Sequence, residues 1–527
     1  MAAHLAARAY DLRERAAAFA AGLQTQARAE TTLACERAVL RLFGVSGLDA
    51  SGRPLALEVV ERLAALGPGR LGGGIALPFA AAAREYDLSP QELALDVAAG
   101  NLDLGLEAEL LREPERRQEA EAMVGAWLAG AWERFDANRT ARTELLAVLG
   151  DPPAPWFGVE LPSLTAGAAA AAAGAIALVP GGVDVVRVRV PRDGELRRGL
   201  DEEFDVADAG EDPLAAPAGS QRGLGALRTA LDEAAAEGGR YLRLGTRSLG
   251  LAAPDQAVVA GFERVDLVFA DPVETVVEFG VEPARAFADH AFAVEVLARS
   301  GASLVLGPGP LAVAPELARG EPLDPATRIG RALALQALSL ELTRQGGLPA
   351  ERILLGALSR DQLTEPVGHL PGIVEVALRR LVFPGHGLVV EEPDEADADA
   401  AWPVALTAWL AAGPAPALVL RRPATAAVAD ASREVRTAVE AAAGLAAARS
   451  LGLLHGEAAA LAKRSLRVAI DTIRELADEG WEHLLLSPAA LARRPEPAEG
   501  WIGAGGRAAK REHLDLLGLG ADAVLAP

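Results

Sequence analysis

Apolar and polar residues follow two different rhythms along the chain. The first 150 residues favour helices: residues 5–28 are rich in Ala, Leu, Arg and Glu, and Ser89 followed by Pro90 marks a helix start. A further long helix is expected over residues 114–138. The proline-rich stretch 151–155 then interrupts the helical pattern and marks a boundary.

Beyond this boundary, short apolar or β-branched runs alternate with longer helical stretches. Such alternation predicts a parallel sheet covered by helices, and eight strand–helix units favour a closed TIM (β/α)8 barrel over an open doubly wound sheet. The expected strands are residues 157–161, 183–190, 241–245, 265–271, 303–306, 352–358, 387–390 and 417–420. The expected helices between them include residues 224–236, 284–299, 326–344, 372–381 and 402–410, with a shorter one near 256–262.

After residue 423 the pattern becomes helical again, over residues 425–449 and 457–479. A short run at 482–486 is either a ninth strand or a helix end, and the Gly- and Pro-rich tail after Arg494 is expected to be loosely structured. We therefore predict an α/β protein built around a TIM barrel with added helical segments at both ends. The expected division is an N-terminal helical segment (1–150), the barrel (151–423) and a C-terminal helical segment with its tail (424–527).

Composition narrows the possible functions. The net charge of −22 disfavours nucleic acid as a partner, because phosphates would be repelled. No apolar run is long enough to span a bilayer and no secretory signal is visible at the start, so a cytoplasmic protein is expected. Cys35 is the single cysteine and is expected to be a small buried residue. With the seven histidines scattered, no metal site is predicted.

The scarcity of lysine has a chemical consequence. The chain contains only Lys463 and Lys510, so residues 1–462 have no lysine at all. An enzyme that forms a Schiff base needs a lysine amine. The predicted barrel therefore cannot supply that amine itself.

Candidate site residues lie where the predicted strands end. In a TIM barrel the active site is at the C-terminal ends of the strands, so the side chains that follow each strand are expected to converge there. Arginines at such a position suit phosphate or carboxylate groups, and acids suit an amine or a proton transfer. The candidates are Arg189, Arg192, Arg247 and Ser248 for binding a cofactor, and Asp271 and Glu274 for binding a substrate.

A simpler interpretation exists for each of these residues. The charges could belong to solvated loops, with Arg187 and Arg189 paired to acids on the surrounding helices. Asp271 is the strongest candidate, because an acid that closes an otherwise apolar strand is poorly explained by packing. Its alternative role is to cap the next helix, which Asp does well.

Several segments resemble the lysine 5,6-aminomutase alpha subunit family. The strongest are residues 31–39 (TTLACERAV) and 41–49 (RLFGVSGLD), followed by 89–93 (SPQEL) and 98–104 (AAGNLDL). Shorter matches recur in the same order at 138–140 (NRT), 182–186 (GVDVV), 241–244 (YLRL) and 263–266 (ERVD). The likeness is fairly continuous over residues 1–310 and thin afterwards.

The resemblance implies a TIM barrel that works with a second, different subunit. In the family, the beta subunit carries a Rossmann-like cobalamin domain and the lysine that holds pyridoxal phosphate. Adenosylcobalamin generates a radical, and pyridoxal phosphate carries the migrating amine of lysine or a similar diamino acid. The missing barrel lysine and the missing Asp-x-His-x-x-Gly cobalamin motif agree with this division, because both would come from the partner.

The same comparison reveals departures at the expected site. The acidic substrate-binding loop of the family, after the fifth strand, is replaced by the Gly/Pro segment 307–310. Arg189 can stand in for a cofactor-binding arginine only with a one-residue slip. Where the family has an Arg and a Ser after strand two, a Ser after strand three and a Tyr after strand four, this chain has Val190, Glu195, Leu249 and Glu274.

Three functions remain open at this point, and so does whether the chain is an enzyme. The first is the alpha-type subunit of an aminomutase dependent on adenosylcobalamin and pyridoxal phosphate. The second is a catalytically degenerate homologue that serves as a scaffold or regulatory subunit for a cobalamin-binding partner. The third is a stand-alone barrel enzyme of other chemistry. A neighbouring gene for a cobalamin-binding chain with a Schiff-base lysine would favour the first two.

Overall fold

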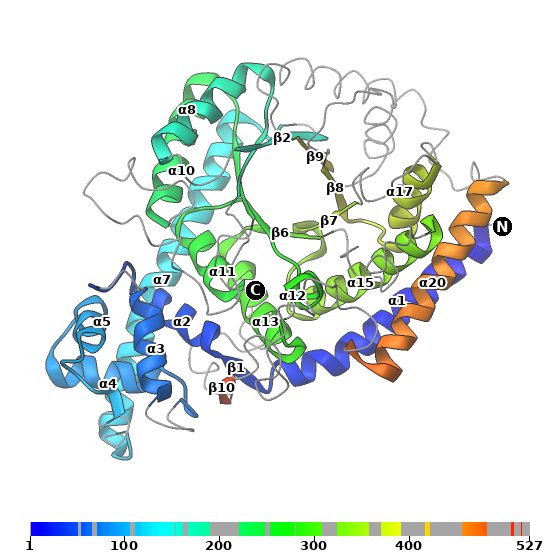
Figure 1. The fold of residues 1–527 in the computed structure, drawn as a ribbon. Coiled ribbons are helices and arrows are strands. Elements are labelled where there is room, and N and C mark those ends of the chain that lie inside the picture. The colour runs from blue at the N-terminus through cyan, green and yellow to red at the C-terminus, as the bar shows by residue number, and fades with distance from the viewer. Residues whose placement is uncertain are drawn as a thin grey trace.

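The computed structural model shows a β-barrel surrounded by helices, with a further group of helices at one flank (Figure 1). Within the described residues, eight parallel strands close into a ring, which confirms the predicted TIM-barrel architecture. The structure describes residues 2–50, 54–65, 71–105, 111–152, 154–161, 167–189, 221–247, 253–279, 281–307, 324–357, 370–391, 417–421, 456–481, 507–510 and 518.

Each barrel strand pairs in parallel with its neighbours, and the first strand closes the ring by pairing with the last. Gly158 of β2 lies opposite Val185 of β3 on one side and opposite Leu420 of β9 on the other. Parallel strands that are covered on both faces have nearly continuous apolar sequences, which is why the pattern alone locates them. The strands are β2 (Trp156–Leu161), β3 (Val185–Arg189), β4 (Arg243–Arg247), β5 (Leu267–Phe269), β6 (Ser303–Leu306), β7 (Ile353–Gly356), β8 (Gly387–Glu391) and β9 (Ala417–Arg421).

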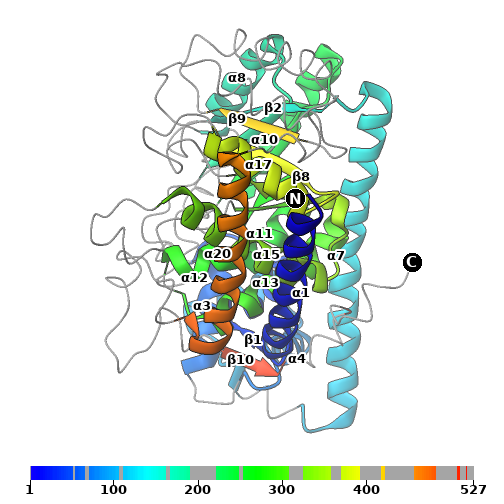
Figure 2. The same cartoon turned by 90° about the vertical axis from the view of Figure 1, so that its right-hand side faces the viewer.

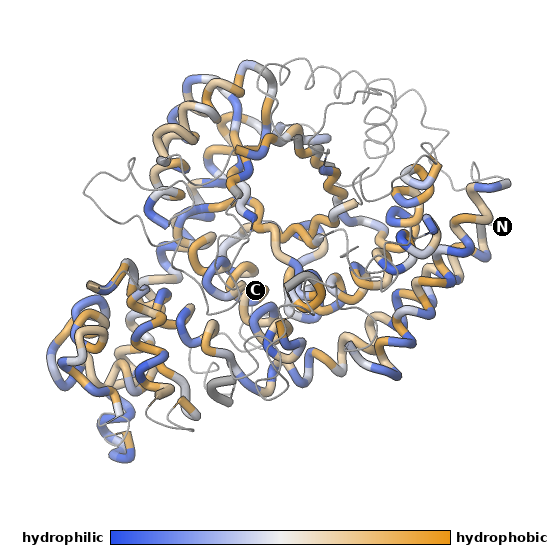
Figure 3. The backbone as a smooth tube through the Cα atoms, in the orientation of Figure 1, coloured by the Kyte–Doolittle hydropathy of each residue, from blue (hydrophilic) through white to orange (hydrophobic). Residues whose placement is uncertain are grey.

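Apolar side chains fill the barrel interior. Around the ring of strands, hydrophobic stretches of the backbone predominate and hydrophilic ones interrupt them (Figure 3). Gly158 makes room for them, because a Cβ there would lie 2.6 Å from Leu420 Cδ2 and 3.0 Å from Leu418 Cδ1. The barrel is a packed core and not a pore, so its chemistry belongs at the strand ends. The buried interior residues are Val185, Leu267, Phe269, Val305, Leu354, Val389, Leu418 and Leu420.

Helices cover the outside of the barrel. The predicted helical stretches 224–236, 284–299, 326–344 and 372–381 each lie within an observed helix, whereas the predicted helix 402–410 falls outside the described residues. The described helices around the barrel are α8 (Ala168–Leu178), α10 (Gln221–Gly238), α11 (Ala253–Phe262), α12 (Pro272–Phe279), α13 (Pro283–Ser300), α15 (Pro325–Gln345) and α17 (Leu370–Val382), with short 3₁₀ turns η1 (Val179–Gly181) and η2 (Ala350–Arg352).

Helices also precede the barrel in the chain. Helix α5 begins with the expected capping box, in which Ser89 accepts a hydrogen bond from the Glu92 amide while the Glu92 side chain binds the Ser89 backbone. Helix α7 runs along one side of the molecule (Figure 2) and continues well past the predicted end at residue 138, because neither Gly nor Pro follows until Gly150. The helices are α1 (Ala2–Ala27), α2 (Leu33–Leu42), α3 (Leu55–Ala65), α4 (Ala76–Tyr86), α5 (Pro90–Ala99) and α7 (Pro114–Leu149).

Described segments from the first and last parts of the chain pack together on the outside of the barrel. Helix α20 (Glu457–Glu479) lies with α1 against α15 (Figure 1). Strand β1 (Glu30–Thr32) pairs antiparallel with β10 (Arg507–Lys510). The expectation of a loosely structured tail is therefore wrong at β10. The backbone of β10 finds its partners in a segment far away in the sequence, which local composition does not reveal.

The proposed boundaries at residues 150 and 423 stay a prediction. The expected helix over 425–449 and the short run at 482–486 lie outside the described residues. Among the helices that the structure describes, none combines the length and the apolar character needed to cross a membrane.

A buried ionic joint attaches helix α2 to the barrel helix α11. Asp255, in the first turn of α11, is fully buried and accepts hydrogen bonds from Arg37 Nη2 at 2.9 Å and from Arg41 Nε at 3.0 Å. Both arginines belong to α2 and follow the Thr-rich segment that begins the family-like motif. Cys35, on the same helix, is buried as expected. The motif therefore forms a structural joint.

A second set of buried joints lies at the N-terminal ends of the strands. Asp266, just before β5, accepts hydrogen bonds from Tyr241 Oη at 2.8 Å and from Arg142 Nε at 2.7 Å. Burial alone would raise the pKa of Asp266, but the charges of Arg142 and Arg228 hold it below its usual range. Asn138 of α7 donates to the last carbonyls of α11. These contacts fix the barrel end that is opposite the expected active site.

Candidate functional site

Charged side chains fill the C-terminal mouth of the barrel. Alternate residues of a strand point to the same face, so acids and arginines at the last inward positions of neighbouring strands are brought together. Glu160 of β2 lies opposite Arg187 of β3 in the strand register. Glu391 is the last residue of β8, and Arg247 is the last residue of β4. The strand ends thus place opposite charges around one ring.

Arg187 is the most deeply buried member of this group, with 1% of its side chain exposed. Its guanidinium donates to Glu391 Oε1 at 2.6 Å and also binds Glu160. The same guanidinium lies over the ring of Phe269, 4.8 Å from its centre, in a cation–π contact. Arg187 therefore pairs with two carboxylates just above the apolar barrel core.

Arg247 extends this network toward helix α12. Its Nη1 donates to both carboxylate oxygens of Glu391 at 3.1 Å, and its Nη2 donates to Glu274 at 3.3 Å. Glu160, Arg187, Glu391, Arg247 and Glu274 form one continuous chain of ion pairs, which we call the mouth network. It contains three carboxylates and two guanidinium groups.

Asp271 lies beside the mouth network and is buried, with 5% of its surface exposed. Its Oδ1 accepts hydrogen bonds from the Val273 and Glu274 amides, at 2.8 and 3.0 Å, which caps α12. The same oxygen accepts a hydrogen bond from Ser339 Oγ of α15 at 2.8 Å, and Oδ2 accepts one from the Gly307 amide at 3.1 Å. The capping alternative for Asp271 is thus confirmed, and Asp271 also ties β6 and α15 to the mouth.

Gly307 is held from both sides where β6 ends. Its amide binds Asp271, and its carbonyl accepts a hydrogen bond from Gln336 Nε2 at 2.6 Å. Gln336 also donates to the Gly356 carbonyl at the end of β7, at 2.9 Å. A Cβ at position 307 would lie 2.7 Å from Glu274 Oε2, so a side chain there would force the Glu274 carboxylate to shift. Glycine at position 307 therefore leaves room for the Glu274 carboxylate in its present position.

Asp271 is expected to make stability depend on pH. Burial, and then the negative charge of Glu274, raise the pKa of Asp271 to about 7. The native state therefore retains a proton that the unfolded chain releases at about pH 4, and the stability that this proton contributes is lost as pH rises through about 7. Melting temperatures of the wild type and of Asp271→Asn should show this loss of stability. They are measured between about pH 5 and 8, a range that contains the raised pKa of about 7.

The expected result is that the wild type loses stability relative to Asp271→Asn as the pH rises. Asp11→Asn is the matched control, because Asp11 is a partly exposed acid on α1 that pairs with Arg15. Its difference from the wild type should stay flat over the same range. A flat profile for Asp271→Asn as well would show that Asp271 does not titrate there.

The structure describes the side chains of only some of the predicted site residues. Arg247, Asp271 and Glu274 are brought together, although their roles in binding stay predictions. Arg189 ends β3 opposite Arg247 in the register, and its side chain is outside the described part of the structure. The remaining two candidates, Arg192 and Ser248, lie outside the described residues.

Three of the five residues of the mouth network, Glu160, Arg187 and Glu391, were not among the candidates from the sequence. Arg187 was expected to pair with acids on helices, but its described partners Glu160 and Glu391 belong to strands. That alternative is wrong because an inward-facing strand position meets other strands across the barrel and not the outer helices. The available signal was an acid within or at the end of an apolar strand. The same signal drew attention to Asp271.

Comparison with known proteins shows which family this chain is similar to. The family model described as the D-lysine 5,6-aminomutase TIM-barrel domain of alpha subunit matches residues 6–310. The lysine 5,6-aminomutase alpha subunit of Fusobacterium nucleatum is 27% identical over 376 residues, covering 71% of this chain and 68% of that protein. The protein of the same name from Acetoanaerobium sticklandii is 26% identical over 372 residues, covering 71% and 67%.

A solved structure of dihydropteroate synthase from Xanthomonas albilineans with 4-aminobenzoic acid is also similar. It is 17% identical and covers 56% of this chain and 94% of its own, with a TM-score of 0.34. A TM-score this low supports no inference about function.

Proposed function

We propose that this chain, which belongs to the family of D-lysine 5,6-aminomutase alpha subunits, is the barrel subunit of an amino-acid isomerase complex. The observation that carries the proposal is the match over residues 6–310, which includes the helices before the barrel and the strands through β6. An alpha subunit implies a beta-type partner. By family resemblance, that partner brings the cobalamin domain and the lysine for pyridoxal phosphate.

The distribution of lysine supports this division of labour. Lys463 lies on α20, outside the barrel, and its side chain is exposed. The other lysine, Lys510, belongs to β10, which pairs with β1 and not with the barrel. No barrel strand contains a lysine. A Schiff base with pyridoxal phosphate at the mouth would therefore use an amine of the partner subunit.

The described residues of the mouth do not fit pyridoxal phosphate. Arg187 and Arg247, the mouth arginines whose side chains the structure describes, are both bound to Glu391. Glu274 occupies the position where the family has a tyrosine that stacks on the pyridine ring. A phosphate here would meet three carboxylates, and an aromatic ring would displace charges that need hydration or a partner. We therefore derive no catalytic step through this cofactor or through adenosylcobalamin.

This misfit favours a second candidate function. A catalytically degenerate homologue could keep the fold and the partner while its mouth is closed by ion pairs. In that function the mouth network stabilises the top of the barrel, with Arg187 bridging Glu160 and Glu391. The chain would then act as a scaffold or regulatory subunit of a cobalamin-binding partner.

Co-expression with a neighbouring beta-type gene product tests both candidates. We expect a stable complex, and borohydride reduction with pyridoxal phosphate should place the adduct on the partner and not on this chain. Lys463→Arg serves as the matched control and should leave the adduct unchanged. Mass spectrometry locates the adduct, and absorbance spectra report bound cobalamin and pyridoxal phosphate.

The outcomes separate the open functions. Binding of both cofactors with turnover of lysine or ornithine would support an active aminomutase subunit and refute degeneracy. A complex without cofactor binding at the mouth would support the scaffold. Failure to form any complex would contradict the proposed function and leave a stand-alone barrel enzyme. A stoichiometric adduct at Lys463 would contradict the lysine argument.

A further inference from the structure

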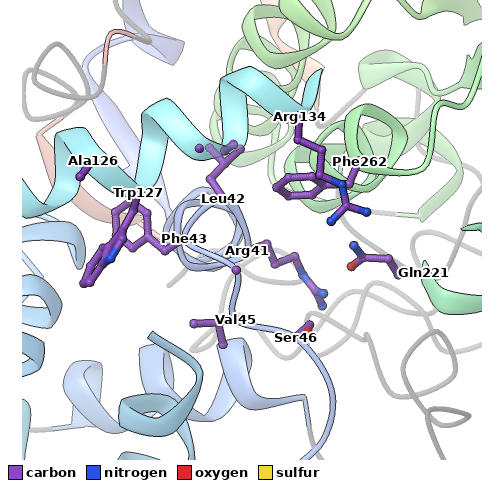
Figure 4. A pocket seen from close by; sticks show the side chains of 13 residues that line it. Arg41, Leu42, Phe43, Val45, Ser46, Ala126, Trp127, Arg134, Gln221 and Phe262 are labelled. Carbon is purple, nitrogen blue, oxygen red and sulfur yellow. The ribbon is translucent and has the colours of Figure 1, made fainter. Parts of the chain in front are cut away.

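A pocket of about 420 Å³ lies on the flank of the barrel, away from the mouth network. This volume is within the range of small-molecule sites, roughly 300–1,000 Å³. The walls come from the C-terminal end of α2 and the loop after it, from α7, and from Gln221 and Phe262 at the ends of α10 and α11 (Figure 4). The pocket and the mouth network share no residue.

One face of helix α7 leaves the pocket open. Ala126, Gly130 and Arg134 follow one another at intervals of four residues, so they lie on the same face of this helix. A Cβ at Gly130 would meet no atom of the described structure within 4 Å, so the space in front of this glycine is empty of side chains. This face therefore provides room that a ligand can occupy.

Aromatic rings border this space. The rings of Phe43 and Trp127 are in contact, with their centres 5.0 Å apart. Phe262 adds a third ring, and the guanidinium of Arg134 lies 5.0 Å from its centre. Such walls suit the flat, apolar body of a small molecule.

The polar end of the pocket offers a hydrogen-bond donor beside an acceptor. Arg134 Nη2 and Gln221 Nε2 both contact Glu263 Oε1, at 3.3 and 3.0 Å, so the two side chains lie close together. Because the Gln221 amide nitrogen faces Glu263, its Oε1 points elsewhere, and this oxygen accepts no hydrogen bond within the described part of the structure. Figure 4 shows the amide directed toward the space between Arg41 and Arg134. Arg134 has five N–H groups, and 56% of its side chain is exposed.

The ion pair at this end favours an uncharged ligand. Glu263 is 11% exposed and pairs with Arg134, so the charges of this pair cancel. Burial raises the pKa of Glu263 although Gln221 and Arg134 act to lower it, which shows that negative charge is poorly solvated here. An anion would have to compete with Glu263 for Arg134, and a cation would meet the exposed guanidinium. A neutral group that forms hydrogen bonds avoids both costs.

The loop that closes the pocket is held in place. The Ser46 amide donates to Gln91 Oε1 at 3.0 Å, and Gln91 Nε2 donates back to the Ser46 carbonyl at 2.9 Å. This two-way bond fastens the loop to α5. The pocket wall is therefore built before any ligand arrives, which lowers the entropy lost on binding.

We propose that this pocket binds an uncharged planar cyclic amide, a ring in which a C=O and an N–H are neighbours. The ligand carbonyl accepts a hydrogen bond from Arg134, and the ligand N–H donates to Gln221 Oε1. The ring packs against Phe43, Trp127 and Phe262. Because no residue is shared with the mouth network, this site does not depend on the proposed function.

Calorimetric titration of the full-length chain tests the recognition with three probes. They are the cyclic amide 2-quinolinone, its N-methyl derivative, which lacks the N–H, and the anion 2-naphthoate, which has a similar shape. We expect 2-quinolinone to bind most tightly. The N-methyl derivative should bind about tenfold more weakly, because it cannot donate to Gln221. The anion should also bind more weakly, because it competes with Glu263.

Two glutamine variants test the acceptor. In Gln221→Met the difference between 2-quinolinone and its N-methyl derivative should disappear, because Oε1 is removed. Gln118→Met is the control, because Gln118 is an exposed glutamine of α7 outside the pocket. It should retain the tenfold difference.

Two glycine variants test the location. Gly130→Leu should abolish binding, because leucine fills the open space, and the protein should stay folded, because leucine favours a helix more than glycine does. Gly125→Leu is the matched control. Gly125 is also an exposed glycine of α7 with no described atom within 4 Å of a Cβ, and it does not line the pocket. It should bind the probes like the wild type, and melting temperatures check that both variants fold.

Several outcomes would overturn the proposal. Equal affinity for 2-quinolinone and its N-methyl derivative would show an apolar cleft without the polar recognition. Tighter binding of 2-naphthoate, absence of binding, or a Gly130→Leu protein that binds like Gly125→Leu would each contradict it as well. Since none of these assays needs a partner or a cofactor, their failure says nothing against the isomerase assignment.

Discussion

Replacing Arg187 with methionine is expected to lower the free energy of unfolding by about 3–5 kcal/mol, the loss typical of breaking a buried ion pair. Arg187 is almost fully buried and contacts Glu160, Glu391 and the ring of Phe269. Methionine retains the apolar stem and removes the charge. Glu160 and Glu391 then lose the guanidinium that they share. Burying a charged carboxylate without its partner is costly, because little water reaches it there.

The midpoint of chemical denaturation, followed by circular dichroism, measures this loss. Arg15→Met is the control, because Arg15 forms a partly exposed pair with Asp11 on α1, and it should change stability by no more than about 1 kcal/mol. Adding Glu160→Gln to Arg187→Met should recover part of the loss, because one of the two carboxylates disappears. An Arg187→Met midpoint equal to that of Arg15→Met would show that the mouth network contributes little to stability.

The barrel was predictable because its signal is local. Buried parallel strands have apolar sequences, and the helices between them repeat at regular spacing. Features that depend on distant partners were not predictable. Strand β10 exists through its pairing with β1, more than 470 residues away in the chain. Nothing in the composition of the Gly-rich tail indicates that pairing.

The candidate site shows the same division between local and distant information. Asp271 was found because an acid at the end of an apolar strand and before a helix is visible in the local sequence. The pairing of Arg187 with Glu391 spans 204 residues, and it requires the register and closure of the whole barrel. Charged residues can therefore be located from the sequence, whereas their partners cannot.

The motifs that reveal the family are concentrated away from the mouth. Tyr241 and Asp266 form a buried contact at the N-terminal ends of the strands, and Asn138 forms partly buried ones there. The segment 31–39 supplies the joint to α11. In a TIM barrel this end of the strands serves stability, and the C-terminal end serves chemistry. The resemblance therefore argues strongly for the fold, while the mouth is free to differ. This explains how a chain can belong to the family with glutamate at position 274.

Replacing Asp255 with asparagine is expected to lower the free energy of unfolding by about 3–5 kcal/mol, because two buried arginines lose the carboxylate that they share. Arg37 and Arg41 each have 2% of their side chains exposed, and Asp255 has none. The loss should loosen α2 from α11 in particular. Limited proteolysis should then cut the variant faster than the wild type within the helices before the barrel.

Two further variants decide whether charge is the cause. Asp11→Asn removes a partly exposed acid from α1 and should lower the free energy of unfolding by about 0.5 kcal/mol or less, so its denaturation midpoint should change very little. Adding Arg37→Met to Asp255→Asn should recover part of the stability. The double variant no longer buries the Arg37 guanidinium without the carboxylate that it binds in the wild type. If the double variant is instead less stable by the sum of the two single losses, the joint acts through packing. An Asp255→Asn protein as stable as Asp11→Asn would show that α2 is held by its apolar face alone.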